Sequence, residues 1–214
     1  MDKIDEIKEK LKELKTLDSK YEIFGASHHK YAFNEPMTLD QLDEFETKYQ
    51  VKLPTDYKRF LNKIGNGGAG PYYGIHPLSR NLGKFNPENK FENLKLAFPH
   101  YRKWNWSKKI LDRFEKLKGD EDEEIAEFFD TIFWQQYGKE ELTSGSLYIS
   151  EYGCALRYLL IVTGDDIGKI WFDQRADHDG INPVVDNNGK KLDFYSWYLE
   201  WLDKSINEIK KQGS

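Results

Sequence analysis

The sequence lacks several features that define whole classes of protein. Cys154 is the single cysteine among 214 residues, so no disulfide can form within the chain. No apolar run approaches the roughly 20 residues that a membrane helix requires. The first residues alternate charged and aliphatic side chains, unlike the apolar centre of a signal peptide. We therefore expect a cytoplasmic protein that folds in a reducing compartment and does not bind a membrane.

An excess of basic residues is also missing. The 32 Lys and Arg are outnumbered by 37 Asp and Glu, which gives a net charge of −5 and a pI near 5.6. Nucleic-acid binding proteins attract phosphates with clustered Lys and Arg, so we expect no direct nucleic-acid binding and, instead, a basic partner. The 38% hydrophobic residues, with 15% aromatic, exclude a disordered chain and predict one domain over residues 1–214.

Helical patterns dominate the first third of the chain. Aliphatic residues spaced three and four apart predict an N-terminal helix over about 3–17. Thr38 and Gln41 have the spacing of a capping box, which predicts a second helix over about 38–49. Pro54 marks the start of a third helix, because proline is tolerated at a first helical position.

A glycine-rich segment follows the third helix. Residues 65–70, Gly-Asn-Gly-Gly-Ala-Gly, match the GxGxxG spacing of dinucleotide-binding loops. That fingerprint requires a strand before it and a helix after it, whereas here a helix precedes it and Pro71 follows. We therefore predict no cofactor and interpret the segment as a tight crossover from helix to strand, in which Gly67 and Gly68 supply positive φ angles.

The rest of the chain carries a helical insertion and the strand signals. Two apolar periodicities separated by acidic residues predict helices over about 107–137. Short β-rich runs predict consecutive antiparallel strands at 146–149, 155–163 and 168–172. Asp193 is the expected N-cap of a closing helix. Together these elements indicate an α+β fold.

Two residue types are expected inside the molecule. Trp171 on its strand and Trp197 and Trp201 on the closing helix are predicted to pack into one core. Cys154 directly precedes an apolar run, so we interpret it as a small buried hydrophobic residue and not as a reactive thiol.

No local motif predicts catalysis. Ser144 and Ser146 lack the strand-to-helix turn that exposes a catalytic serine. The densest set of potential metal ligands matches neither an EF-hand loop nor an HExxH or CxxC motif; it comprises Asp173, Asp177, His178 and Asp179. We interpret it as a polar loop that leaves a strand, with a hard cation bound by oxygen ligands as the alternative. We predict a protein that is not an enzyme, with a small hydrolase or metal enzyme as the weaker alternative.

Several segments, taken in order, are similar to one family. They are Leu53 to Leu61 (LPTDYKRFL), Gly65 to Pro71 (GNGGAGP), Tyr73 to Leu78 (YGIHPL), Phe98-Pro99, Glu151 to Cys154 (EYGC), Leu159 to Gly164, Gly168 to Asp173 (GKIWFD) and Phe194 to Leu202 (FYSWYLEWL). In this order and spacing the chain resembles the SUKH superfamily, whose namesakes include a fungal cell-wall-assembly regulator. The resemblance covers a core of about residues 37–203.

The resemblance implies both a fold and a function. Members are α+β domains with a mostly antiparallel, curved sheet flanked by helices, to which this chain adds its helical insertion. Bacterial members are commonly immunity proteins that neutralise polymorphic toxins, many of them nucleases, by direct binding. The family motifs are largely structural and imply no catalytic residues. We therefore expect a non-catalytic immunity protein, with an intracellular regulatory or scaffolding domain as the alternative.

Acidic clusters are the predicted contact residues for a basic toxin. An inhibitor that competes with nucleic acid for a cationic cleft needs carboxylates on loops held by a rigid sheet. Simple solvation of a helix start or a loop is the other interpretation of each cluster. The candidates are Asp120, Glu121, Asp122, Glu123 and Glu124, then Asp165 and Asp166, then Asp177 and Asp179.

Overall fold

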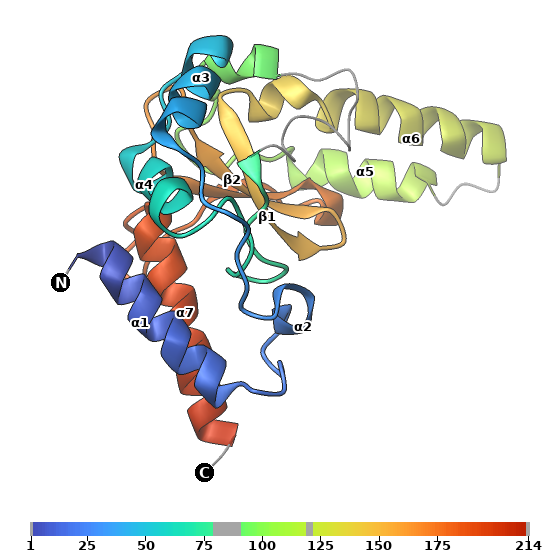
Figure 1. Cartoon of the computed structure of the whole chain (residues 1–214). Helices are drawn as coiled ribbons and strands as arrows, with labels where there is room; N and C mark the ends of the chain where they lie inside the picture. Colours follow the sequence, from blue (N-terminus) through green and yellow to red (C-terminus); the bar gives the residue numbers. More distant parts are fainter. Residues whose placement is uncertain (1, 79–90, 119–121, 213–214) are drawn as a thin grey trace.

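A four-stranded sheet lies at the centre of the molecule. The computed structural model describes residues 2–78, 91–118 and 122–212 (Figure 1). The strands are β1 Ser146–Gly153, β2 Leu156–Ile161, β3 Ile170–Gln174 and β4 Gly180–Pro183, in the order β1-β2-β3-β4. Every neighbouring pair is antiparallel. The expected α+β fold with an antiparallel sheet is therefore confirmed.

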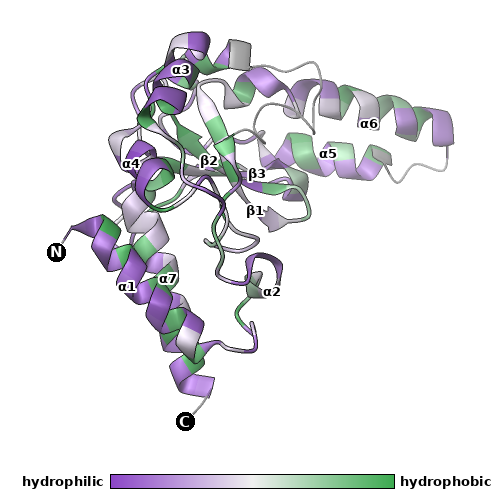
Figure 2. Ribbon diagram, viewed as in Figure 1, coloured by the Kyte–Doolittle hydropathy of each residue, from purple (hydrophilic) through white to green (hydrophobic). Residues whose placement is uncertain are grey.

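Helices from both ends of the chain lie beside this sheet. They are α1 Lys3–Leu17, α2 Ala26–His29, α3 Leu39–Tyr49, α4 Thr55–Lys63 and α7 Phe194–Gln212. Thr38 and Gln41 form the predicted capping box at the start of α3. Helices α1 and α7 lie side by side (Figure 1) and mix hydrophilic with hydrophobic residues (Figure 2), because each buries one face and exposes the other.

The predicted insertion is a helical hairpin that projects from the sheet (Figure 1). It consists of α5 Lys108–Lys118 and α6 Glu123–Tyr137, and the 3-10 helix η3 Glu140–Thr143 leads from it into β1. Two more 3-10 helices are η2 Phe91–Lys95 and η4 Arg175–Asp177. The Arg175 Nη1 donates to the carbonyls of Tyr137 (3.1 Å) and Lys139 (2.9 Å), which fastens the base of the hairpin to the sheet.

Both faces of the sheet are buried, against two different clusters. Along β2, Tyr158 and Leu160 belong to the large cluster built with α1, α4 and α7, whereas Leu159 and Ile161 belong to a smaller cluster on the other face. This alternation follows from the period of two along a strand. The smaller cluster also contains Trp171.

The prediction that three tryptophans share one core was wrong. Trp171 is inaccessible and contacts Phe98, with ring centroids 4.9 Å apart, in the smaller cluster. Trp197 is buried in the large cluster and Trp201 packs against its edge. Sequence periodicity places a residue on a face of its own element, but it does not say which faces of two distant elements meet.

The interpretation of Cys154 as a buried residue was also wrong. Its side chain is exposed. Cys154 and Ala155 form the turn between β1 and β2, with φ angles of 51° and 62°. Two consecutive positive φ angles are typical of a two-residue hairpin turn of type I′, so the apolar run begins one residue later, at Leu156.

The glycine-rich segment ties three parts of the chain together. Gly67 and Gly68 have φ angles of 80° and 116°, as predicted. The Gly68 N–H donates to the carbonyl of Ile75 (2.8 Å), and the Ala69 N–H donates to that of Ala32 (2.7 Å). These N–H groups are therefore engaged within the protein and do not point at a bound phosphate. The residues that follow form single bridges and not the strand expected after the crossover.

One strand, β4, was not predicted. It is short, ends at Pro183 and lies at the edge of the sheet, where a missing N–H costs no ladder hydrogen bond. Within the described parts of the chain, none of the helices combines the length and the apolar character that crossing a bilayer requires.

Substitution of Gly68 by valine should strongly destabilise the fold. A Cβ there lies 2.4 Å from the carbonyl oxygen of Ala32, in addition to the strain of a positive φ. We expect Gly68→Val to lower the free energy of unfolding by more than about 3 kcal/mol. Gly189→Val is the control, because Gly189 has a φ of 78° but no atom within 4 Å of an added Cβ. Urea denaturation that gave equal losses for both variants would contradict the packing argument.

Truncation of Trp171 should cost more than truncation of Trp201. Trp171 is inaccessible and its Nε1 donates to Asp166 (3.0 Å), whereas Trp201 is only partly buried. We expect Trp171→Ala to lower the free energy of unfolding by about 3–5 kcal/mol and Trp201→Ala by less. Chemical denaturation followed by circular dichroism measures both, and the reverse order would mean that the smaller cluster adds little stability.

Candidate binding groove and acidic clusters

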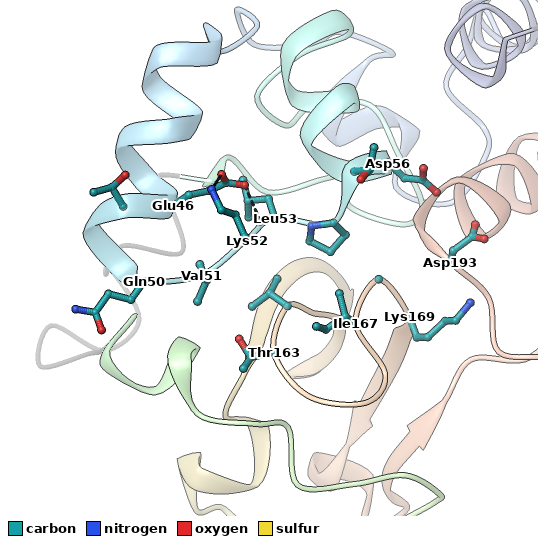
Figure 3. Close-up of a pocket in the computed structure, with 15 residues that line it drawn as sticks. Glu46, Gln50, Val51, Lys52, Leu53, Asp56, Thr163, Ile167, Lys169 and Asp193 are labelled. Carbon is teal, nitrogen blue, oxygen red and sulfur yellow. Dashed lines mark hydrogen bonds and ion pairs between the residues drawn. The ribbon is translucent and has the colours of Figure 1, made fainter.

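An open groove lies between the α3–α4 connection and the turn that joins β2 to β3. It encloses about 740 Å³. Figure 3 shows Val51 on one wall and Thr163 and Ile167 on the other. The lining residues are Glu46, Thr47, Gln50, Val51, Lys52, Leu53, Pro54, Thr55, Asp56, Val162, Thr163, Ile167, Gly168, Lys169 and Asp193.

Glu46 fixes the wall formed by the α3–α4 connection. Its buried carboxylate accepts hydrogen bonds from the Leu53 N–H (2.8 Å), Lys52 Nζ (2.9 Å) and Lys58 Nζ (3.0 Å). Burial opposes ionisation, but these three donors outweigh it and hold the pKa of Glu46 below its ordinary value of 4.5. A single carboxylate therefore joins the end of α3 to the start of α4.

Two further carboxylates, those of Asp56 and Asp193, lie where the groove meets α7. Burial and the charge of Asp193 raise the pKa of Asp56 above its ordinary value of 3.8. Burial also opposes ionisation of Asp193, but hydrogen bonds with Ser196 outweigh it and lower the pKa of Asp193. Asp193 is the predicted N-cap of α7, since the Ser196 N–H donates to its Oδ1 (2.8 Å).

The described lining of this groove combines apolar and charged side chains. Among the described residues its lining contains no histidine, cysteine or serine, and its polar side chains include Thr163, Lys169 and Asp56. Its walls combine apolar residues with Lys52 and Lys169, and Ile167 remains 54% exposed at the edge. An apolar surface bordered by charges is the usual make-up of a protein interface.

The described residues of the first acidic cluster, Asp122 to Glu124, lie at the start of α6, away from the sheet (Figure 1). Asp122 is the N-cap of α6, because its Oδ1 accepts from the N–H groups of Glu124 (3.1 Å) and Ile125 (3.3 Å). Glu123 and Glu124 are exposed in the first turn, where a negative charge interacts favourably with the helix dipole and stabilises the helix. The other two predicted residues, Asp120 and Glu121, lie outside the described residues.

The second cluster follows β2 and borders the groove. Asp165 is exposed, one residue before Asp166 and two before Ile167. Asp166 accepts from Trp171 Nε1 (3.0 Å) and pairs with Lys191, whose Nζ lies 5.0 Å from the centre of the Trp171 ring. Asp166 therefore supports the smaller core cluster, and Asp165 is the carboxylate of this pair that a partner can reach.

The third cluster lies near the base of the hairpin. Asp177 and Asp179 are exposed, and Asp179 pairs with Lys103 (2.6 Å). His178 Nδ1 lies 2.8 Å from the Glu115 carboxylate of α5, and its ring contacts Phe133 of α6.

The fourth candidate metal ligand, Asp173, has a structural partner. It is buried and pairs with Arg175 through Nε (2.8 Å) and Nη2 (2.7 Å). Within the described ranges, no group of three or more His, Cys, Asp or Glu side chains is arranged to hold a metal ion.

Sequence reasoning did not find the groove. Its walls come from Glu46 to Asp56, from Val162 to Lys169 and from Asp193, and no spacing rule relates these distant segments. The local signals were present, because Pro54 and the Gly-Asp-Asp turn at residues 164–166 mark the two connections that form the walls.

Removal of the Glu46 charge should destabilise the α3–α4 connection in a pH-dependent way. We expect Glu46→Gln to lower the free energy of unfolding by about 1–2 kcal/mol at pH 7, because two lysine contacts weaken. The folded-state pKa is lowered, so this contribution is complete above the unfolded-state pKa and is lost as the pH falls through the folded-state pKa. Urea titrations of both proteins between about pH 7 and pH 3 should show the difference shrinking below about pH 4.5. A constant difference would rule out the ionic mechanism.

Comparison with known proteins connects this geometry to a family. The chain matches the SMI1 / KNR4 family (SUKH-1) over residues 36–193. The matched range contains the whole sheet and every residue that lines the groove. No curated protein and no solved structure matches the chain. Because the family match extends from the residues before α3 to the N-cap of α7, the chain belongs to the SMI1 / KNR4 family, SUKH-1.

Proposed function

We propose that this chain is a non-catalytic immunity protein that binds and neutralises a cognate bacterial toxin, a basic protein such as a nuclease. The observation that carries the proposal is membership of the SUKH-1 family over residues 36–193, for which the resemblance implies toxin neutralisation. A regulatory or scaffolding domain that binds a different protein is the alternative, and the experiment below separates the two.

Electrostatics supports a basic partner. The chain has a net charge of −5, and complementary charge speeds encounter and disfavours wrong partners. The charge is unevenly distributed: residues 122–137 hold five acidic side chains and no Lys or Arg. On α6 this acidic surface also contains Phe128, which is 60% exposed. An aromatic side chain among carboxylates suits a cationic surface with an apolar recess.

The acidic clusters are the proposed contact residues. Their exposure and their contacts within the chain indicate which carboxylates are available to a partner. Glu123, Glu124, Asp165 and Asp177 are exposed carboxylates on helix ends or turns. Asp122, Asp166 and Asp179 are each also engaged in a cap or an ion pair. In the proposed mechanism, exposed carboxylates occupy positions where a nuclease binds phosphates, so that the inhibitor blocks the cleft by occupancy and one molecule protects against one toxin molecule.

Charge reversal should identify the cluster that binds. The chain is co-purified with the toxin encoded beside its own gene, and the dissociation constant is measured for Glu123→Lys/Glu124→Lys, for Asp165→Lys and for Asp177→Lys/Asp179→Lys. We expect the correct reversal to raise Kd at least about thirtyfold, as for an interface hot spot, and the others to change it by less than about fivefold. Glu9→Lys, an exposed residue of α1, is the control for net charge.

Salt and stoichiometry distinguish the outcomes. Binding through these carboxylates should weaken between about 50 mM and about 300 mM salt, and toxin activity should be lost at one equivalent of the chain. Affinity that neither salt nor any reversal changes would reject the acidic clusters. Failure to bind the product of any neighbouring gene would favour the regulatory alternative.

A further inference from the structure

A small cavity with aromatic walls lies beside α7 and shares no lining residue with the groove. It encloses about 240 Å³ between α7, residues 23–24 before α2 and residues 71–72 after the glycine-rich segment. Five of its lining residues are aromatic, and two of the polar ones are glutamates. The lining consists of Ile23, Phe24, Pro71, Tyr72, Tyr158, Val184, Leu192, Trp197, Glu200, Trp201, Lys204, Ser205 and Glu208.

The aromatic walls are held in place by contacts with the core. The Tyr72 ring stacks on Tyr158 (centroids 5.1 Å apart, planes 7° apart), and Tyr158 stacks on Phe172 (4.3 Å, 10°). The Tyr158 hydroxyl donates to that of Tyr72 (3.0 Å), and the ring centroids of Trp197 and Tyr158 are 5.2 Å apart. Tyr72 has a φ of 58°. These walls need little reordering to receive a ligand.

Helix α7 places carboxylates along the same cavity. Trp197, Glu200, Trp201, Lys204, Ser205 and Glu208 recur at spacings of three and four, so they occupy one face of the helix. Lys204 pairs with Glu200 one turn away, and its side chain is 75% exposed. The two glutamates outnumber the single lysine, so the cavity has an acidic border.

The cavity continues into exposed aromatic side chains. Phe24 is 50% exposed, Tyr73 38% and Tyr152 41%. The Phe24 ring lies 5.4 Å from that of Tyr73 and 5.5 Å from that of Tyr152, so the three form one patch. A contiguous exposed aromatic patch is typical of a protein-binding surface.

We propose that this cavity binds an arginine side chain of a protein partner, with the guanidinium between the aromatic walls and the carboxylates of Glu200 and Glu208. Its volume is smaller than the roughly 300–1,000 Å³ of a cofactor or drug site and suits one long side chain. A guanidinium stacks on aromatic faces and pairs with carboxylates, which matches this combination of walls and border. The inference rests on the proposed function only in that the partner is a basic protein.

A peptide titration tests the pocket without the toxin. The peptide acetyl-Gly-Arg-Gly-amide is added to the whole chain, and the indole N–H resonances of Trp197 and Trp201 are followed by NMR after assignment with Trp197→Phe and Trp201→Phe. We expect saturable shifts of these two signals with a Kd in about the millimolar range, as for a ligand of few atoms. The citrulline peptide has the same shape without the charge and should bind at least about fivefold more weakly.

Substitutions in the aromatic wall and at the acidic border of the cavity test whether the arginine peptide binds there. Phe24→Ala and Glu208→Gln should each raise the Kd of the arginine peptide about two- to fivefold. Tyr101→Ala and Glu44→Gln, an exposed aromatic and an exposed carboxylate outside both proposed binding surfaces, should leave it unchanged.

Three results would overturn the proposal. These are absence of shifts at Trp197 and Trp201, equal affinity for the arginine and citrulline peptides, and tighter binding of a proline-rich peptide, which would indicate an apolar groove. Because no toxin is used, each of these results leaves the test of toxin neutralisation unaffected. If the chain binds the arginine peptide but does not bind the toxin, the proposed function is rejected and the arginine pocket is still supported.

Discussion

The burial of β2 on both faces is the constraint on which the rest of the structure depends. Tyr158 and Leu160 face the helical layer, while Leu159 and Ile161 face the cluster around Trp171. Because a strand alternates its side chains, neither face can change register without exposing the other. The sheet is therefore a rigid frame, and turns, helix ends, one face of α7 and the projecting hairpin lie around it. Such segments vary without loss of the core.

The acidic residues divide into two groups that do different work. Asp18, Glu46 and Asp173 are buried, and each holds a connection together through hydrogen bonds to backbone or cationic groups. The exposed carboxylates proposed as contacts lie at the hairpin tip, the β2–β3 turn and the η4 turn. The net charge of −5 therefore does not describe where the negative charge lies. Some carboxylates are neutralised inside the fold, and others are exposed at separate places on the surface.

Local patterns in the sequence predicted local structure well. The Thr38–Gln41 box, the period of α1 and the cap at Asp193 depend on residues within one turn, and all three are confirmed. The errors concern relations between distant segments. Trp171 and Trp201 occupy opposite sides of the sheet, and the exposure of Cys154 follows from a turn whose φ angles are not visible in an apolar run. The groove and the aromatic cavity depend on tertiary placement in the same way.

The aromatic cavity crosses the boundary of the family match, and this has a physical consequence. Tyr72 and Tyr158 lie inside residues 36–193, whereas Phe24, Trp197 and Trp201 lie outside that range. The matched part therefore supplies the stacked rings fixed to the sheet, and the flanking segments complete the walls. Desolvated aromatic contacts mainly set how slowly a complex dissociates, while exposed carboxylates mainly set how fast it forms. The proposed contacts of both kinds lie on different elements, and the sheet with its two clusters holds these elements in place.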